Sequence, residues 1–217
     1  MADTSPVSEA FTLHFADHYL LALEKPSGLL SVPGRGADKQ DCLATRVQAH
    51  YPDALTVHRL DMATSGLILM ARGKAMQSTL NRLFSERRVE KQYEALLEGE
   101  LKPARGTVDL PLICDWPNRP RQKVCFQYGK ASQTEYEKLE VDTSAHRTRV
   151  RLIPHTGRSH QLRVHMQAIG HPILGDEFYA TPAGRAASQR LLLHACRLVF
   201  RHPASGKIMT LISPAPF

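Results

Sequence analysis

The apolar run from Leu67 to Met70 predicts a buried strand. The stretch 57–66 leads directly into this strand and contains a single carboxylate, Asp61, two residues after Arg59. Small, turn-forming residues follow Asp61. A carboxylate in such a basic, partly apolar neighbourhood is either a structural salt-bridge partner or an acid held ready for chemistry. Taken alone, the residues of this stretch leave both interpretations open.

Strand-like patterns dominate the chain on both sides of this stretch. They alternate apolar and polar residues or are enriched in β-branched residues, and Gly and Pro bound them. The predicted strands are residues 19–23 within the loosely alternating stretch 11–24, then 66–71, 91–97, 107–113, 123–127, 132–141, 148–153 and 191–195, with a hairpin of 198–200 and 207–212 around residues 203–206.

The spacing of apolar residues also predicts three helices. The clearest spans residues 74–88, where the apolar side chains fall on one stripe and arginines lie near the end. A short helix is expected within 41–50. A third is expected to begin with Ser159 as its N-cap and to stop at Gly170. Strands and helices together favour one mixed α+β domain.

The charge of the chain points to an anionic partner. Twenty-eight Lys and Arg residues oppose twenty-one Asp and Glu residues, giving a net charge of +7 and a pI near 9.4. Such a balance favours nucleic acid before a membrane surface, because contacts to phosphates release counterions. A merely basic surface would show the same balance, so the charge by itself does not decide between them.

Cysteine usage and the N-terminus favour a cytoplasmic protein. The four cysteines are scattered without a CxxC pair, which argues against a disulfide framework and against a zinc knuckle. Residues 1–10 are polar and contain acids, unlike a signal peptide, and we expect them to be flexible. The sequence has no apolar run of the length that a membrane span requires.

Residues 114–123 form an irregular loop that contains the sole tryptophan of the sequence, Trp116, together with two prolines and three cations. An aromatic ring among cations could stack on and clamp RNA. Alternatively, a contact between Trp116 and proline could simply fix the loop. Both interpretations stand.

Cofactor and metal motifs are missing from the sequence. It has no P-loop, no GxGxxG and no GxSxG elbow. His155, His160 and His165 recur at intervals of five, which places them on no single face of a helix or strand, so capping and packing roles are expected rather than a metal site. The chemistry still compatible with these residues is catalysis by one carboxylate without a cofactor or metal. An ionised Asp61 beside an arginine could act as a nucleophile in such a reaction.

Residues 58–61, followed by Thr64, Ser65 and Gly66, resemble the signature motif of the RluA family of RNA pseudouridine synthases. Further family-like motifs occur in the family's order, so that the resemblance spans about residues 20 to 195. These motifs are 25–28, 91–93, 156–165, 174–176 and 193–195.

The resemblance implies a single catalytic domain over residues 1–217, of α+β class, with a mixed, mostly antiparallel central sheet and flanking helices. Many family members carry an N-terminal S4 domain, for which this chain is too short. The loops 31–35 and 114–120 resemble those of members that modify both 23S ribosomal RNA and the tRNA anticodon stem-loop. The implied partner is RNA, and a monomer is the expected state.

The resemblance also assigns roles to five residues. Asp61 matches the catalytic aspartate that attacks the target uridine, at the base or at the sugar. Arg163 matches the arginine that pairs with this aspartate, and Tyr93 the tyrosine that packs on the flipped base. Arg59 matches the arginine that enters the stack where the uridine leaves, at a flipping cost of roughly a few kcal/mol. Leu193 is expected to line the pocket.

Two other functions are compatible with the composition. One is a catalytically silent RNA-binding module, against which the intact Asp61, Tyr93 and Arg163 argue. The other is a carboxylate-dependent glycosylase or hydrolase that cleaves the bond to the base and releases it. Loss of tritium from C5 of uracil without loss of the base would separate a pseudouridine synthase from both.

Overall fold

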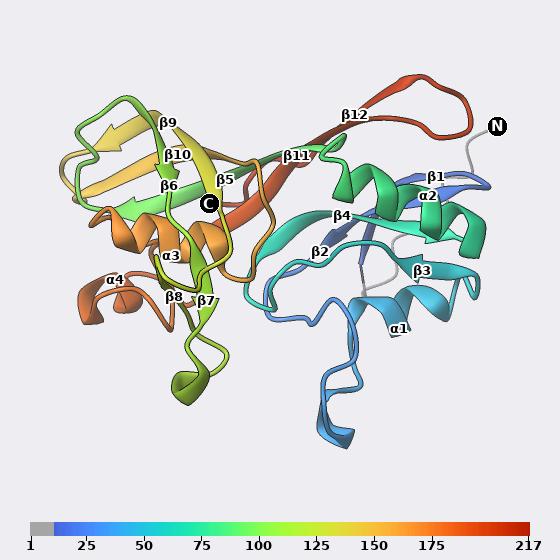
Figure 1. Cartoon of the computed structure of the whole chain (residues 1–217), viewed down its shortest axis with the longest axis horizontal. Helices are drawn as coiled ribbons and strands as arrows, with labels where there is room; N and C mark the ends of the chain where they lie inside the picture. The colour runs from blue at the N-terminus through green and yellow to red at the C-terminus, as the bar shows by residue number, and fades with distance from the viewer. Residues whose placement is uncertain (1–10) are drawn as a thin grey trace. The chain divides into compact units, whose positions relative to one another are not determined.

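The computed structural model of the chain describes residues 11–217, so the expectation for residues 1–10 lies outside the described residues. Residue contacts divide the chain into two compact units, whose elements Figure 1 labels. The first comprises Met1–Val89 and Arg197–Pro214, and the second comprises Glu90–Cys196 and Ala215–Phe217. The single domain over residues 1–217 stays a prediction.

The first unit is built on antiparallel strands in the order β1-β2-β4-β11, with β3 paired to β4 and β12 paired to β11. Within the described residues of this unit, two α-helices and one short 3₁₀ helix accompany the strands. The elements are β1 (Thr12–Ala16), β2 (Leu20–Lys25), η1 (Ala37–Lys39), α1 (Leu43–Gln48), β3 (Ala54–Thr56), β4 (Ser65–Arg72), α2 (Lys74–Ser85), the later residues of β11 (Leu193–Arg201) and β12 (Ile208–Ile212).

Strand β4 lies at the centre of this unit and is buried on both faces. Leu67 and Leu69 pack in one cluster with Leu80 of α2, whereas Ile68 and Met70 pack in another with α1. Because successive side chains of a strand point to opposite faces, a strand covered on both sides is apolar throughout. The predicted buried strand is confirmed.

The second unit has strands in the order β11-β5-β10-β9-β6 and a separate hairpin of β7 and β8. Its described strand pairs are antiparallel. The elements are β5 (Glu90–Glu98), β6 (Arg105–Asp109), β7 (Leu112–Cys114), η2 (Trp116–Asn118), β8 (Gln122–Val124), β9 (Gln133–Asp142), β10 (Arg147–Pro154), α3 (Gln161–Ala168), α4 (Pro182–Ala186) and the first residues of β11.

Helix α3 begins one residue later than expected, and Ser159 is not its cap. His160 is the N-cap, in the left-handed conformation at φ 53°, and makes no side-chain capping bond. The side chain of Gln161 instead accepts the backbone N–H of Arg158 at 3.0 Å. The Ser159 prediction was wrong because the chain turns sharply at His160, after the expected cap. The predicted stop is confirmed, since Gly170 follows the helix at φ 86°.

The strand predicted at 107–113 is in fact two strands with different partners. Strand β6 pairs with β9, and β7 pairs with β8. Pro111 lies between them and has no N–H to donate to a continuing ladder. A period-two pattern shows which residues are extended but not where a strand changes its partner.

The α+β class with a mixed, mostly antiparallel sheet and flanking helices is confirmed. Most predicted elements occur within a few residues of their expected bounds; the helix expected at 74–88, for example, is α2, which ends at Ser85. Across residues 11–217, none of the helices is both long enough and apolar enough to span a membrane.

Candidate active site

Asp61 lies in the loop between β3 and β4 and is half-buried. Its carbonyl accepts the N–H of Thr64 at 3.1 Å, which closes a tight turn. Arg59, two residues earlier, is exposed, and over residues 11–217 its guanidinium makes no described ion pair. The two residues predicted to act on the RNA from this motif thus share one loop, with the acid partly enclosed and the cation at the surface.

The backbone of this loop is held by a second loop that follows β2. The hydroxyl of Ser31 donates to the carbonyl of Leu60 at 2.8 Å and accepts the N–H of the same residue at 3.1 Å. The hydroxyl of Ser27 donates to the carbonyl of Ala63 at 2.6 Å. The residues on both sides of Asp61 are therefore fixed by hydrogen bonds.

Lys25 completes this support with a fully buried ammonium group. Its Nζ donates to the backbone carbonyls of Pro26 at 2.8 Å, Leu29 at 2.7 Å and Met62 at 3.0 Å. Lysine is rarely buried unless its charge is stabilised, and three carbonyl dipoles do so here. The motif 25–28 marked this segment in the sequence, but its role as the support of the Asp61 turn appears only in the structure.

His58 fixes the loop from the other end. Its Nε2 accepts the backbone N–H of Leu69 in β4 at 2.8 Å. Its ring stacks on Phe84 of α2, with centroids 4.3 Å apart. Because a backbone N–H can only donate, Nε2 carries no proton in this arrangement. The loop is thus attached to both the central strand and a helix of its unit.

In the second unit, Arg163 lies on the first turn of α3 and is buried. Its Nε and Nη2 each donate to Asp176 at 2.7 Å, in a bidentate pair with a carboxylate that is itself fully buried. The guanidinium also lies 5.2 Å from the ring centroids of both Phe178 and Tyr179. Bidentate pairing sets the orientation of the guanidinium plane as well as its position.

Asp176 was not among the predicted site residues, although it belongs to the family-like motif 174–176. Its Oδ1 accepts the backbone N–H groups of Phe178 at 2.9 Å and Tyr179 at 3.2 Å in addition to the bond from Arg163. One buried carboxylate therefore holds both the arginine and the two rings beside it. The predicted pairing of Arg163 with Asp61 joins residues of different units and stays a prediction.

Hydrogen bonds fix the rest of α3. The ring of His165 lies between Thr134 Oγ1 at 2.9 Å and the carbonyl of Leu110 at 3.0 Å, and burial lowers the pKa of His165. Nδ1 of His160 lies 2.8 Å from the hydroxyl of Tyr179. These two histidines have packing roles, as expected. In the part of the chain that the structure describes, no group of three or more His, Cys, Asp or Glu could hold a metal ion.

The remaining predicted residues belong to strands of the second unit. Tyr93 is half-buried in β5, opposite Leu152 of β10. Leu193 is buried at the start of β11. Their roles against a substrate base stay predictions. Asp61 and Arg59 thus come from the first unit, and Tyr93, Arg163 and Leu193 from the second.

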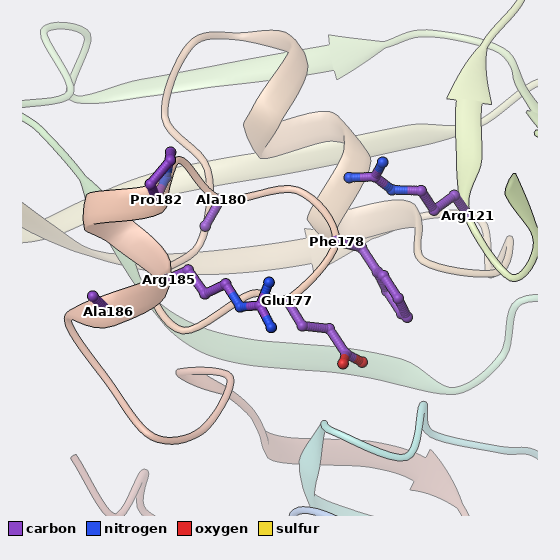
Figure 2. A pocket seen from close by; sticks show the side chains of 7 residues that line it. All are labelled: Arg121, Glu177, Phe178, Ala180, Pro182, Arg185 and Ala186. Carbon is purple, nitrogen blue, oxygen red and sulfur yellow. The ribbon is translucent and has the colours of Figure 1, made fainter.

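A groove of about 570 Å³ lies in the second unit. Figure 2 shows the side chains that line it. In this view the side chains of Arg121 and Arg185 lie on its two sides, with Phe178 and Glu177 between them. None of the five predicted site residues lines the groove, but Phe178 does, and the ring of Phe178 also contacts Arg163. The lining thus combines two cations and one carboxylate with an aromatic ring, which suits a ligand that has a planar part and polar groups.

Comparisons with known proteins agree with these motifs. The family model described as RNA pseudouridylate synthase matches residues 19–168. A relative from Escherichia coli K12, named dual-specificity RNA pseudouridine synthase RluA, is 55% identical, and the alignment covers 100% of this chain and 99% of the relative. A relative of the same name from Vibrio parahaemolyticus is 50% identical, with 100% of this chain and 88% of the relative covered.

Two solved human structures share the fold. RNA pseudouridylate synthase domain containing 1 is 30% identical with a TM-score of 0.81, covering 99% of this chain and 87% of that one. RNA pseudouridylate synthase domain containing 4 is 26% identical with a TM-score of 0.73, covering 94% of this chain and 88% of that one. The sequence motifs, the full-length relatives and the fold agree, and the chain belongs to the RluA family of RNA pseudouridine synthases.

Proposed function

We propose that this pseudouridine synthase uses Asp61 as its nucleophile and modifies uridines in two kinds of RNA, a stem-loop of 23S ribosomal RNA and the anticodon stem-loop of tRNA. The observation that carries the proposal is the support of the Asp61 turn, where Lys25, Ser27 and Ser31 bind the backbone on both sides of the carboxylate. A nucleophile placed in advance needs little reorganisation to react. Dual specificity is supported by the printed names of relatives that match this chain over its full length.

The reaction is an isomerisation and balances without a co-reactant. Attack by the Asp61 carboxylate, at the base or at the sugar, leads to cleavage of the bond between uracil N1 and the ribose. The base then turns and forms a new bond from C5 to the same ribose carbon. The proton on C5 is lost to a base, N1 gains a proton, and the carboxylate is released unchanged.

The other predicted residues prepare the substrate. The exposed Arg59 fills the space that the uridine leaves, which offsets part of the flipping cost of roughly a few kcal/mol. Tyr93 packs on the flipped base, and Leu193 lines the pocket. Arg163, held in one orientation by Asp176, pairs with Asp61 and aims it at the uridine.

The Lys and Arg side chains that give the chain its positive charge contact the RNA phosphates. Binding should therefore weaken steeply as salt rises, because each phosphate contact releases counterions. We infer that the enzyme acts as a monomer in the cytoplasm, where its RNA substrates occur.

Tritium release from RNA labelled at uracil C5 tests the proposal. Wild-type protein should release tritium from both a tRNA and a 23S stem-loop and leave the strand without abasic sites. Asp61→Asn should release none, yet bind the RNA within a few-fold of wild type, since the carboxylate serves chemistry rather than phosphate contact. Asp53→Asn makes the same change at a surface carboxylate of the same unit that pairs with Arg72, and it should retain turnover.

The alternatives give different results in this assay. A silent RNA-binding module would bind the RNA and release no tritium. A glycosylase would leave abasic sites. Release from only one of the two RNAs would refute dual specificity while leaving the chemistry in place.

A further inference from the structure

Three of the large exposed hydrophobic side chains lie close together in the sequence of the second unit. Trp116 is 67% exposed, Phe126 79% and Tyr128 70%. All three belong to the aromatic hairpin, by which we mean residues 112–130: strand β7, the turn η2, strand β8 and the turn at 126–128. A soluble protein seldom exposes so many large rings in one short segment without a partner for them.

The turn that carries Trp116 is rigid. The carboxylate of Asp115 accepts hydrogen bonds from the side chains of Asn118 at 2.8 Å and Lys123 at 3.0 Å. These bonds lower the pKa of the Asp115 carboxyl group. The N–H of Asp115 donates to the carbonyl of Arg121 at 2.9 Å. Trp116 is therefore held at the surface by the backbone of its own turn rather than by burial of its ring.

The second turn is equally well fixed. Lys130 and Leu112 exchange two backbone hydrogen bonds, of 2.8 and 3.0 Å. The N–H of Gly129 donates to the carbonyl of Cys125 at 2.9 Å, and a Cβ at Gly129 would clash with that same oxygen. In residues 11–217, neither Phe126 nor Tyr128 takes part in a described ring contact. The backbone hydrogen bonds of this turn thus hold Phe126 and Tyr128 in place while both rings stay exposed to solvent.

The hairpin is rich in cations. Arg119, Arg121, Lys123 and Lys130 all belong to the hairpin, against one acid, Asp115. The guanidinium of Arg119 lies 4.0 Å from the ring centroid of Trp116, so it covers one face of the indole and leaves the rest exposed. Arg121 also lines the groove of Figure 2, which extends the basic surface toward Arg185.

We propose that the aromatic hairpin is a stacking surface for unpaired nucleotides of the RNA loop next to the target uridine, and that it helps to select the substrate. The inference rests on the proposed function. Every base has a face that can stack on an aromatic ring, whereas bases within a duplex have both faces occupied. Strand β8 separates the two turns by about 10 Å at roughly 3.3 Å per residue, so Trp116 and the other two rings would take different nucleotides.

The protein carries its own probe for this contact, because Trp116 is its one tryptophan. A labelled stem-loop is titrated into the Asp61→Asn protein, so that binding is observed without turnover. RNA anisotropy reports binding, and tryptophan emission reports stacking. We expect saturable quenching with the same midpoint as the anisotropy, and no quenching with a fully paired duplex of the same stem. Saturated binding with unchanged emission would overturn the proposal.

Kinetics with variants of the otherwise wild-type protein give a second readout. Trp116→Ala, Phe126→Ala and Tyr128→Ala should each raise KM by roughly 5- to 150-fold, the range for loss of one base–aromatic stack. The value of kcat should stay within about two-fold, since by this proposal the rings stack on nucleotides other than the uridine that reacts. Tyr19→Ala removes a ring that is 44% exposed in the first unit and should change neither constant.

The outcomes separate this inference from the proposed function. If wild-type protein releases no tritium from the stem-loop, the proposed function fails. If it releases tritium and all three variants keep the wild-type KM, the hairpin proposal fails alone, and Trp116 with Arg119 only fixes its own loop. Should Trp116→Ala fail to fold, the two most exposed rings, Phe126 and Tyr128, still carry the test.

Discussion

Replacing Lys25 by methionine tests whether one buried cation holds the Asp61 turn. The change keeps an unbranched side chain but takes the Lys25 donor away from three backbone carbonyls, of which that of Met62 keeps the N–H of Gly28 at 2.8 Å. An unsatisfied buried acceptor costs about 1 kcal/mol or more. The bond to Leu29 is fully buried and water can partly replace the other two, so the free energy of unfolding should fall by about 2–3 kcal/mol.

Two assays check this expectation. In urea, followed by far-UV circular dichroism, the unfolding midpoint should fall by roughly 1 M. In the tritium assay, kcat should fall by about 100-fold, since a shift of about 1 Å at a reacting group has an effect of this size, while RNA affinity changes little. Lys207→Met makes the same substitution at an exposed lysine of the same unit and should behave as wild type. An unchanged midpoint together with an unchanged kcat in Lys25→Met would refute the role of Lys25.

Two further expectations concern the second unit. Asp176→Asn should lower the free energy of unfolding by about 3–5 kcal/mol in urea, because it removes the buried carboxylate that pairs bidentately with the buried Arg163; a loss below about 1 kcal/mol would contradict the importance of this pair. Burial holds the pKa of His165 below its ordinary value of 6.5, so the unfolded chain takes up a proton there before the folded chain does. Stability should therefore be complete above about pH 6.5 and decline below it, with a shallower decline in His165→Gln and the wild-type decline in His50→Gln.

The sequence predicted the elements of the fold better than their connections. Alternation identified most strands, and the buried strand β4 followed from its unbroken apolar run. The break at Pro111 and the change of partner between β6 and β7 were missed, because pairing depends on residues distant in sequence. Ser159 looked like a helix cap by residue type alone, yet the chain turns at His160.

At the candidate site, motifs located the segments but not their internal roles. Lys25 lies 37 residues from Met62, and Arg163 lies 13 residues from Asp176. No local pattern links such positions, so the sequence placed Lys25 and Asp176 in family-like motifs without indicating which groups they bind. The one feature of the sequence that could have indicated these roles is a charged residue inside an otherwise apolar or turn-rich motif. Such a charge is seldom buried without a partner.

The division of strand β11 between the units has a consequence for synthesis on the ribosome. The first unit needs residues 197–214, so its strand β4 waits for a neighbour that is made more than a hundred residues later. At about 5 to 20 residues per second, that delay lasts roughly 5 to 20 s. The second unit, nearly continuous in sequence, can fold during this time. Until β11 arrives, β4 has β2 along one edge but β3 along only Met70–Arg72 of the other, and the rest of that edge is open to chaperones or to aggregation.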